Sequence, residues 1–234
     1  MQRGKLYLIP TPLGENGPQI LPQYVLNTVH QIDIFIAERA KTARRYIKTI
    51  EHPKAISELT FSELNKRIDR EEWQQYLNPA LTGNDIGLLS EAGCPGVADP
   101  GADIVKLAHE KDIEVIPLVG PSSILLAMMA SGMNGQCFAF HGYLSPKKEI
   151  VGKDLKRLEQ LAQQQKQTQL FIETPYRNGQ LVEQAIKVLG PKTQFCIAMD
   201  LTLPTQYVKT RTIGQWRQEK LPELHKRPAV FLLL

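Results

Sequence analysis

Short apolar runs alternate with amphipathic segments along the first half of the chain. Runs of this length, rich in Leu, Ile and Val, predict buried β-strands, at 5–9, 33–37, 86–90 and 114–118. Apolar residues at helical spacing predict helices at 21–31, 41–50, 61–77 and 104–111. Because parallel strands need crossover connections, this alternation favours an α/β domain with a mostly parallel sheet.

The pattern changes after the Val-Gly-Pro-Ser turn at 119–122. Helices are expected at 123–130, 154–167 and 178–189, and strands at 138–142, 169–173, 194–199, 207–213 and 229–234. The last strands resemble a hairpin more than a crossover, which favours a mixed sheet. We therefore expect two α/β domains, an N-terminal one at 1–117 and a C-terminal one at 118–234.

Composition and charge narrow the class of protein. The chain has 234 residues, 42% of them hydrophobic and 22% charged, which is typical of a soluble globular protein. Its net charge of +4 is too small to indicate nucleic-acid binding by itself. The basic residues form two local clusters, which a solvated helix face also explains: Arg39, Lys41, Arg44, Arg45 and Lys48, then Lys147, Lys148, Lys153, Lys156 and Arg157.

The cysteines and the apolar segments give no sign of a metal site, a disulfide or a membrane-spanning helix. Cys94, Cys137 and Cys196 are scattered, without the spacing of a metal site or a disulfide framework. The first residues match no signal peptide, and no apolar stretch reaches membrane-spanning length. We expect no metal, no disulfide and no membrane association, and a cytoplasmic location.

Three loops rich in Gly, Pro and small residues each follow an expected strand, at 10–14, 90–96 and 120–123. In open parallel sheets, ligands bind at the carboxyl ends of strands, where small residues let backbone groups approach them. Each loop could also be an ordinary turn. The chain has no GxGxxG fingerprint, P-loop, HExxH or GxSxG motif, which disfavours dehydrogenases and hydrolases. The residues alone predict a two-domain α/β protein that binds a small polar ligand.

The loop sequences also resemble a known superfamily. LYLIPTPLG at 6–14, IGLLSEAGCPGVADPG at 86–101 and VIPLVGPSS at 115–123 resemble the tetrapyrrole methylases. Segments 37–38, 130–133, 140–148, 173–177 and 200–202 are similar to the branch that methylates a cytidine ribose 2′-oxygen in small-subunit ribosomal RNA. The resemblance implies a two-domain tetrapyrrole methylase-like fold, a homodimer, and ribosomal RNA or the small ribosomal subunit as partner.

The same resemblance implies S-adenosylmethionine as cofactor, held in a cleft between the domains. Backbone amides and serine hydroxyls would bind its carboxylate and ribose, and apolar side chains would line one wall. The implied cofactor-binding residues are Pro12, Leu13, Gly14, Ser90, Glu91, Ala92, Gly93, Val97, Ser122, Ser123, Phe171, Pro228 and Ala229.

Methyl transfer to a ribose hydroxyl needs a group that accepts the hydroxyl proton, because the hydroxyl is a poor nucleophile. The expected catalytic residues are Glu38, Glu173 and Asp200, with Glu91 as a further candidate. Glu38 could equally be a carboxylate that stabilises a helix start. Glu173 could simply form an ion pair with Arg177.

The expected substrate-binding residues are Arg39, Lys41, Arg44, Glu63, Asn65 and Arg177. The substrate segments depart from the branch pattern more than the cofactor loops do. Arg39, Ala40 and Lys41 replace its Asp-Thr-Arg, Glu63 lacks its flanking histidines, and two basic groups are missing at 199–203. Two alternatives therefore stay open: a methyltransferase with a small tetrapyrrole-like acceptor, and a non-catalytic RNA-binding relative on the same fold.

Overall fold

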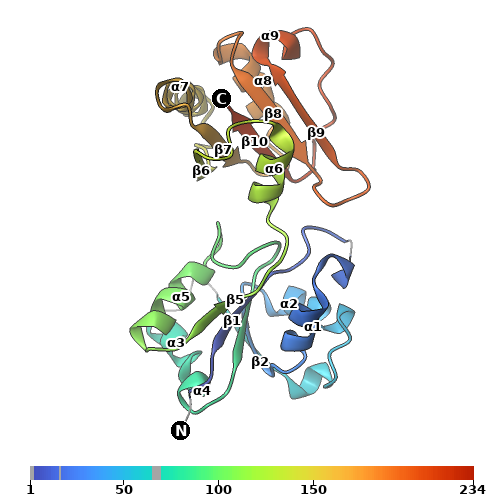
Figure 1. Cartoon of the computed structure of the whole chain (residues 1–234), viewed down its shortest axis with the longest axis vertical. Coiled ribbons are helices and arrows are strands. Elements are labelled where there is room, and N and C mark those ends of the chain that lie inside the picture. Colours follow the sequence, from blue (N-terminus) through green and yellow to red (C-terminus); the bar gives the residue numbers. More distant parts are fainter. Residues whose placement is uncertain (1–2, 16, 65–69) are drawn as a thin grey trace. The chain divides into compact units, whose positions relative to one another are not determined.

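The computed structural model of the chain describes residues 3–15, 17–64 and 70–234. The chain divides into two compact units between Ser122 and Ser123 (Figure 1). One unit contains a parallel sheet and the other a mixed sheet, each with five strands. The α/β class predicted from the sequence is confirmed.

The sheet of the first unit is wholly parallel. Its strands lie in the order β3-β2-β4-β1-β5, with bounds β1 Leu6–Ile9, β2 Ile34–Ala37, β3 Thr60–Glu63, β4 Ile86–Leu89 and β5 Val115–Pro117. Alternate residues face two separate cores, as Phe35 and Ile36 do. A sheet buried on both faces explains why its strands read as continuous apolar runs.

Helices cover both faces of this sheet. Helices α1 (Gln23–Val29) and α2 (Ala40–Thr49) pack on one face. Helices α3 (Arg70–Gln75), α4 (Asn78–Leu81) and α5 (Gly101–Glu110) pack on the other. The described part of this unit also contains two 3₁₀ turns, Pro18–Ile20 and Ile56–Glu58.

One expected element is wrong in part. Where a helix was expected at 61–77, the described residues form the edge strand β3 at its start and helix α3 in its later part. The strand is half-buried or exposed along its length, so it lacks the apolar run that marks the inner strands. Its backbone pairs with β2, and this tertiary pairing overrides the local helical spacing.

The strand order places a switch point between β1 and β4. The chain leaves β1 toward β2 and leaves the neighbouring β4 toward β5, on the opposite side. Ligands of open α/β sheets bind at the carboxyl ends of strands at such a point. The topology therefore predicts a ligand site at the loops that follow β1 and β4.

The second unit has a mixed sheet in the order β6-β7-β10-β8-β9. Only β6 and β7 pair in parallel. The strands are β6 Phe138–Tyr143, β7 Thr168–Ile172, β8 Gln194–Met199, β9 Tyr207–Thr212 and β10 Ala229–Leu233. The expected mixed sheet is confirmed.

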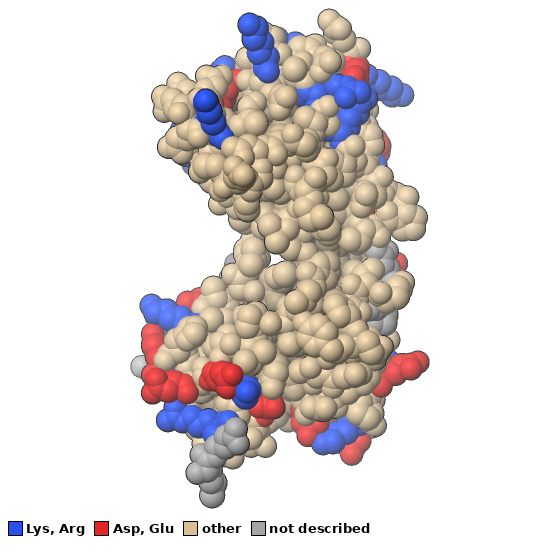
Figure 2. All heavy atoms as spheres, in the orientation of Figure 1, with Lys and Arg blue, Asp and Glu red and all other residues tan. Residues whose placement is uncertain are grey.

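Helices α7 (Lys148–Gln165), α8 (Asn178–Val188) and α9 (Ile213–Trp216) share one core with this sheet. Helix α6 (Ser123–Ser131) packs on β8, β9 and β10. In Figure 2, the visible charged side chains of the second unit are mostly basic, whereas the first unit shows both signs interspersed.

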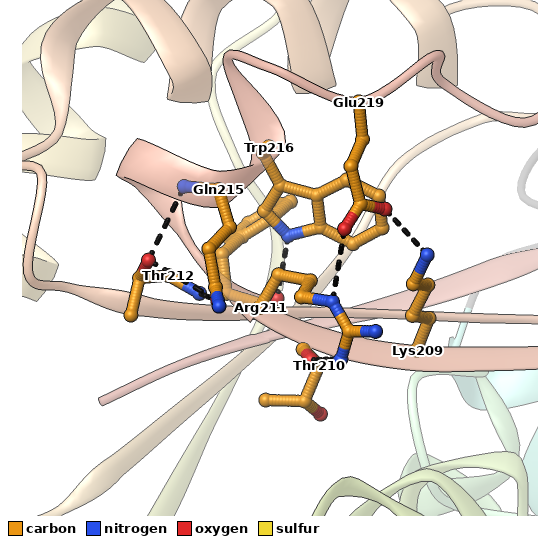
Figure 3. A network of polar contacts seen from close by, with 8 residues as sticks. Lys209, Thr210, Arg211, Thr212, Gln215, Trp216 and Glu219 are labelled. Carbon is orange, nitrogen blue, oxygen red and sulfur yellow. Dashed lines mark hydrogen bonds and ion pairs between the residues drawn. The ribbon is translucent and has the colours of Figure 1, made fainter.

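Side chains of edge strand β9 and of the segment that follows it form a network of polar contacts (Figure 3). The carboxylate of Glu219 bonds both Lys209 and Arg211, two residues apart on β9. Beneath it, the buried Trp216 donates its Nε1–H to the Phe195 carbonyl at 2.8 Å. Paired charges on an edge strand protect it from pairing with other chains.

A buried carboxylate joins α7 to the turn before β8. Glu159 Oε1 accepts hydrogen bonds from Gly190 N–H at 2.6 Å and the Thr193 hydroxyl at 2.5 Å, and Lys156 pairs with Oε2 at 2.9 Å. Burial alone raises the pKa of Glu159, but the bonds from Thr193, Lys156 and Gly190 outweigh it and hold the pKa below its ordinary value. The fold therefore favours the ionised form.

Glu159→Ala is expected to destabilise the protein by about 2 kcal/mol at pH 7, because two buried donors lose their acceptor. Urea unfolding followed by circular dichroism measures this, with Glu183→Gln on the exposed surface of α8 as control. The difference from wild type should shrink as the pH falls from about 4.5 through the lowered folded-state pKa. An unchanged unfolding midpoint at pH 7 would contradict this role.

Candidate functional site

Three loops meet at the carboxyl edge of the parallel sheet and are joined through Gly93. Thr11, after β1, and Gly93, after β4, exchange two backbone hydrogen bonds of 3.0 Å. A Cβ on Gly93 would lie 3.2 Å from Leu13 Cδ2 and 3.4 Å from the carbonyl oxygen of Pro121, after β5. With φ at +77°, this position favours glycine. The expected loops are therefore one connected structure.

A second close approach joins the loops after β1 and β5. A Cβ on Gly120 would lie 2.3 Å from Pro10 Cγ, so only glycine lets the two loops pack at this point. Cys94 adds a bond from Sγ to the Pro121 carbonyl at 3.4 Å. Burial raises the pKa of the Cys94 thiol. This cysteine fastens a loop as a neutral thiol.

Ser90 shapes its own loop. Its buried hydroxyl donates to the Gly93 carbonyl at 2.6 Å and lies 3.2 Å from the Thr11 hydroxyl. The hydroxyl hydrogen is therefore used inside the loop, and the expected contact of Ser90 with a ligand stays a prediction. Glu91 and Ala92, which follow it, are half-buried and exposed.

Asp99 closes the long loop after β4. Its Oδ1 accepts the N–H groups of Gly96 at 2.7 Å and Gly101 at 2.8 Å, just before α5 begins. Burial raises the pKa of Asp99 against the lowering effect of these two bonds, and the charge of Glu38 adds to the rise. Glu38, at the end of β2, thus lies close enough to act on this loop electrostatically. Val97 in the same loop is exposed.

A hollow of about 380 Å³ lies between α2 and the loops after β1 and β4. From the loops, its walls include the expected residues Pro12, Leu13, Gly14, Ser90, Glu91 and Ala92. From α2, they include Thr42, Ala43, Arg45, Tyr46 and Thr49. Such a volume lies at the lower end of the range for small-molecule sites. We call it the α2 pocket.

The residues of α2 that line this pocket were not predicted from the sequence. Thr42, Tyr46 and Thr49 recur at helical spacing, and so form one face of α2. That spacing was the available signal. Basic residues alternate with these three along the helix, and the cluster was therefore interpreted only by its charge.

The expected substrate residues lie on or beside α2. Arg39 precedes the helix, and Lys41, Arg44, Arg45 and Lys48 are all exposed on it. Arg44 stacks over the Phe61 ring at 5.2 Å. Glu63, at the end of β3, accepts the Ala40 N–H at 2.6 Å and so caps the start of α2. Asn65 lies outside the described residues.

In the second unit, Glu173 and Arg177 form the local ion pair. Their atoms Oε1 and Nη2 are 2.5 Å apart, and the same oxygen accepts the Thr174 N–H at 2.6 Å. Both residues line a separate hollow between α7 and α8, of about 390 Å³. This geometry fastens the turn between β7 and α8.

Asp200 directly follows β8 and lies at the same edge of the mixed sheet as Glu173, which follows β7. Its Oδ2 bonds Arg227 Nε at 2.7 Å and the Thr205 hydroxyl at 2.8 Å. Its N–H donates to Pro228, which precedes the buried Ala229 of β10. Like Glu173, Asp200 has an arginine partner and links loops, so neither carboxylate stands free in the structure.

Phe171, expected on the apolar wall of the cofactor site, is fully buried. Its side chain has no exposed area and packs against both Phe195 and Phe231 in the core of the second unit. Its position in the register of β7 places it in the core beneath the sheet. Ser122 and Ser123 flank the division between the units.

Within the described residues, no three His, Cys, Asp or Glu side chains gather as metal ligands. No described helix is both long and apolar enough to cross a membrane.

Comparison with known proteins identifies the family. No family model matches the chain. It is 32% identical to ribosomal RNA small subunit methyltransferase I of Vibrio cholerae, over 84% of this chain and 65% of that protein. It is 30% identical to the protein of the same name from Bacillus subtilis, over 92% of this chain and 71% of that protein.

Solved structures show the same fold. The methyltransferase CobJ aligns over 98% of this chain and 93% of its own, with a TM-score of 0.64 at 17% identity. Uroporphyrin-III C-methyltransferase from Thermus thermophilus, complexed with S-adenosylhomocysteine, aligns over 98% and 97%, with a TM-score of 0.55 at 14% identity. The resemblance to tetrapyrrole methylases is confirmed, and the chain belongs to the ribosomal RNA small subunit methyltransferase I family.

Proposed function

We propose that the chain is an S-adenosylmethionine-dependent methyltransferase that methylates a ribose 2′-oxygen in small-subunit ribosomal RNA. The observation that carries the proposal is the set of three joined loops at the switch point of the parallel sheet. Family membership and the S-adenosylhomocysteine complex of a protein with the same fold support it. The chain spans about two thirds of the length of the relatives with which it was compared.

The proposed cofactor site uses the loops of the first unit. Pro12, Leu13 and Gly14 offer backbone groups and an apolar side chain, and the loop after β4 offers the backbone of Glu91 and Ala92. Gly93 and Ser90 act by fixing the shape of these loops. A preformed loop structure binds a ligand without the entropy loss of ordering it.

S-adenosylmethionine supplies an electrophilic methyl group when it is bound. The protein must then orient the acceptor oxygen and take its proton. Glu38 suits the proton-accepting role better than Glu173 or Asp200, because the described residues give it no ion pair or hydrogen bond. It directly follows strand β2, which ends at Ala37, and so lies at the same sheet edge as the three loops.

The basic surface of α2 supports an RNA acceptor. Lys41, Arg44, Arg45 and Lys48 are exposed within one ten-residue helix that carries no acidic residue. Lysine and arginine side chains on one surface bind consecutive phosphates. A tetrapyrrole-like acceptor would instead need an apolar surface at this place.

We also propose a homodimer that acts on the small ribosomal subunit in the cytoplasm. Exposed apolar side chains on the second unit supply apolar contact area, namely Leu125, Met129, Phe138 and Tyr143. Contiguous exposed apolar side chains are typical of interaction surfaces. The cytoplasmic location follows from the proposed substrate, because the protein must reach the small ribosomal subunit to act on it.

Glu38→Gln is expected to lower methyl transfer by about 100-fold or more, since the amide cannot accept the proton. Transfer of tritiated methyl groups to small ribosomal subunits, prepared from cells in which the gene is deleted, measures this. Glu72→Gln, an exposed change on α3, should retain full transfer. Wild-type protein that methylates no RNA would refute the proposed function, and methylation of a tetrapyrrole instead would redirect it.

Gly93→Val is expected to destabilise the protein by about 1–3 kcal/mol, because a β-branched residue is strained at positive φ and crowds Leu13 and Pro121. It should also abolish the rise in Tm that S-adenosylhomocysteine produces in wild type. Gly135→Ala is the control, since a Cβ there meets no atom within 4 Å. A full ligand-dependent Tm rise in the Gly93 variant would disprove the importance of this joint.

A further inference from the structure

The α2 pocket has room that the proposed cofactor residues do not account for. Its loop wall contains expected cofactor-binding residues, but its other wall is the Thr42–Thr49 face of α2, which no assigned role explains. None of its lining residues comes from the loop after β5. The loops after β1 and β4 thus have one side toward α2 and another toward Pro121, to which Gly93 packs.

The helical wall is cationic and carries hydroxyl groups. Arg45 is exposed and lines the pocket, and Lys41 and Lys48 are exposed on the same helix. Thr42 and Thr49 also line the pocket, and the Thr49 hydroxyl already bonds the Tyr46 carbonyl. An arginine beside neutral hydroxyl groups suits a ligand that joins a phosphate to a sugar or base.

Tyr46 is an incompletely satisfied polar residue in this wall. Its side chain is nine-tenths buried, and its hydroxyl has no hydrogen-bond partner among the described residues. Buried tyrosine hydroxyls usually have a partner, and lacking one is costly. Burial raises the pKa of this hydroxyl well above its ordinary value, so it stays a neutral donor.

The volume of the α2 pocket suits a single nucleotide better than a longer RNA segment. The volume of about 380 Å³ matches one small molecule, not a folded RNA helix. Sequence-specific RNA recognition commonly takes an unstacked base out of a loop while its phosphates stay on a basic surface. Here, the exposed Lys41, Arg44 and Lys48 supply that surface beside the pocket.

We propose that the α2 pocket holds the acceptor nucleotide of the RNA, with Arg45 on its phosphate and Thr42 and Tyr46 as hydrogen-bonding partners. This assignment rests on the proposed RNA methyltransferase function. It makes the loops after β1 and β4 a wall shared by two ligands, with the acceptor on the α2 side. Arg45, Thr42 and Tyr46 are then specificity-determining residues.

Two variants test the assignment through acceptor affinity. Arg45→Gln should raise the KM for small ribosomal subunits about tenfold or more, and Tyr46→Phe about threefold to tenfold, as expected for one charged and one neutral hydrogen bond. Both should keep their affinity for S-adenosylhomocysteine within about twofold of wild type. Tyr46→Phe should keep or raise Tm, because it removes a buried hydroxyl that has no partner.

Matched controls separate this site from general effects. Lys106→Gln removes one positive charge from α5, and Tyr7→Phe removes a hydroxyl from β1, neither in the pocket. Both should leave the KM within about twofold of wild type. Pocket variants that behave like these controls, in an enzyme that methylates RNA, would overturn the assignment.

Calorimetry with S-adenosylhomocysteine provides the other decisive outcome. If Arg45→Gln and Tyr46→Phe weaken this ligand as much as RNA, the pocket belongs to the cofactor and the assignment is wrong. Wild-type protein that transfers no methyl group to RNA would overturn the proposed function itself. The two failures are therefore distinguishable.

Discussion

The site depends on the pair of backbone hydrogen bonds between Thr11 and Gly93. These bonds join the loops after β1 and β4 at the switch point of the sheet, and Gly93 also packs against Pro121 after β5. Because the partners are backbone groups, the two bonds do not depend on the side chain of Thr11, whereas position 93 requires glycine. The loops can therefore form a rigid ligand platform while neighbouring residues vary, as the substrate segments of this chain do.

The sequence predicted most of the fold because its strands are buried on both faces. Strands such as Ile86–Leu89 carry no polar side chain in such a sheet, and this makes them recognisable in the sequence alone. Strand β3 was missed because it lies at an edge, where half of its surface needs no apolar side chain. Pairing with β2 determines its conformation, and this pairing cannot be inferred from the spacing of apolar residues within the segment.

The site was predictable where backbone geometry requires particular residues and less so where side chains act in three dimensions. Gly93 was expected because a tight loop needs glycine, and the structure gives it a positive φ. The pairing of Asp200 with Arg227 could not be inferred, since 27 residues separate them. The inward orientation of Phe171 depends on strand register, and the pocket face of Tyr46 on how α2 packs.

Calorimetric titration of the purified protein with S-adenosylhomocysteine tests the central claim most directly, which is that the three joined loops form a cofactor site. The structure predicts one binding site per chain, with a dissociation constant of about micromolar order, or roughly −8 kcal/mol. Absence of binding by folded protein would contradict the claim and would favour a non-catalytic RNA-binding role for the same fold.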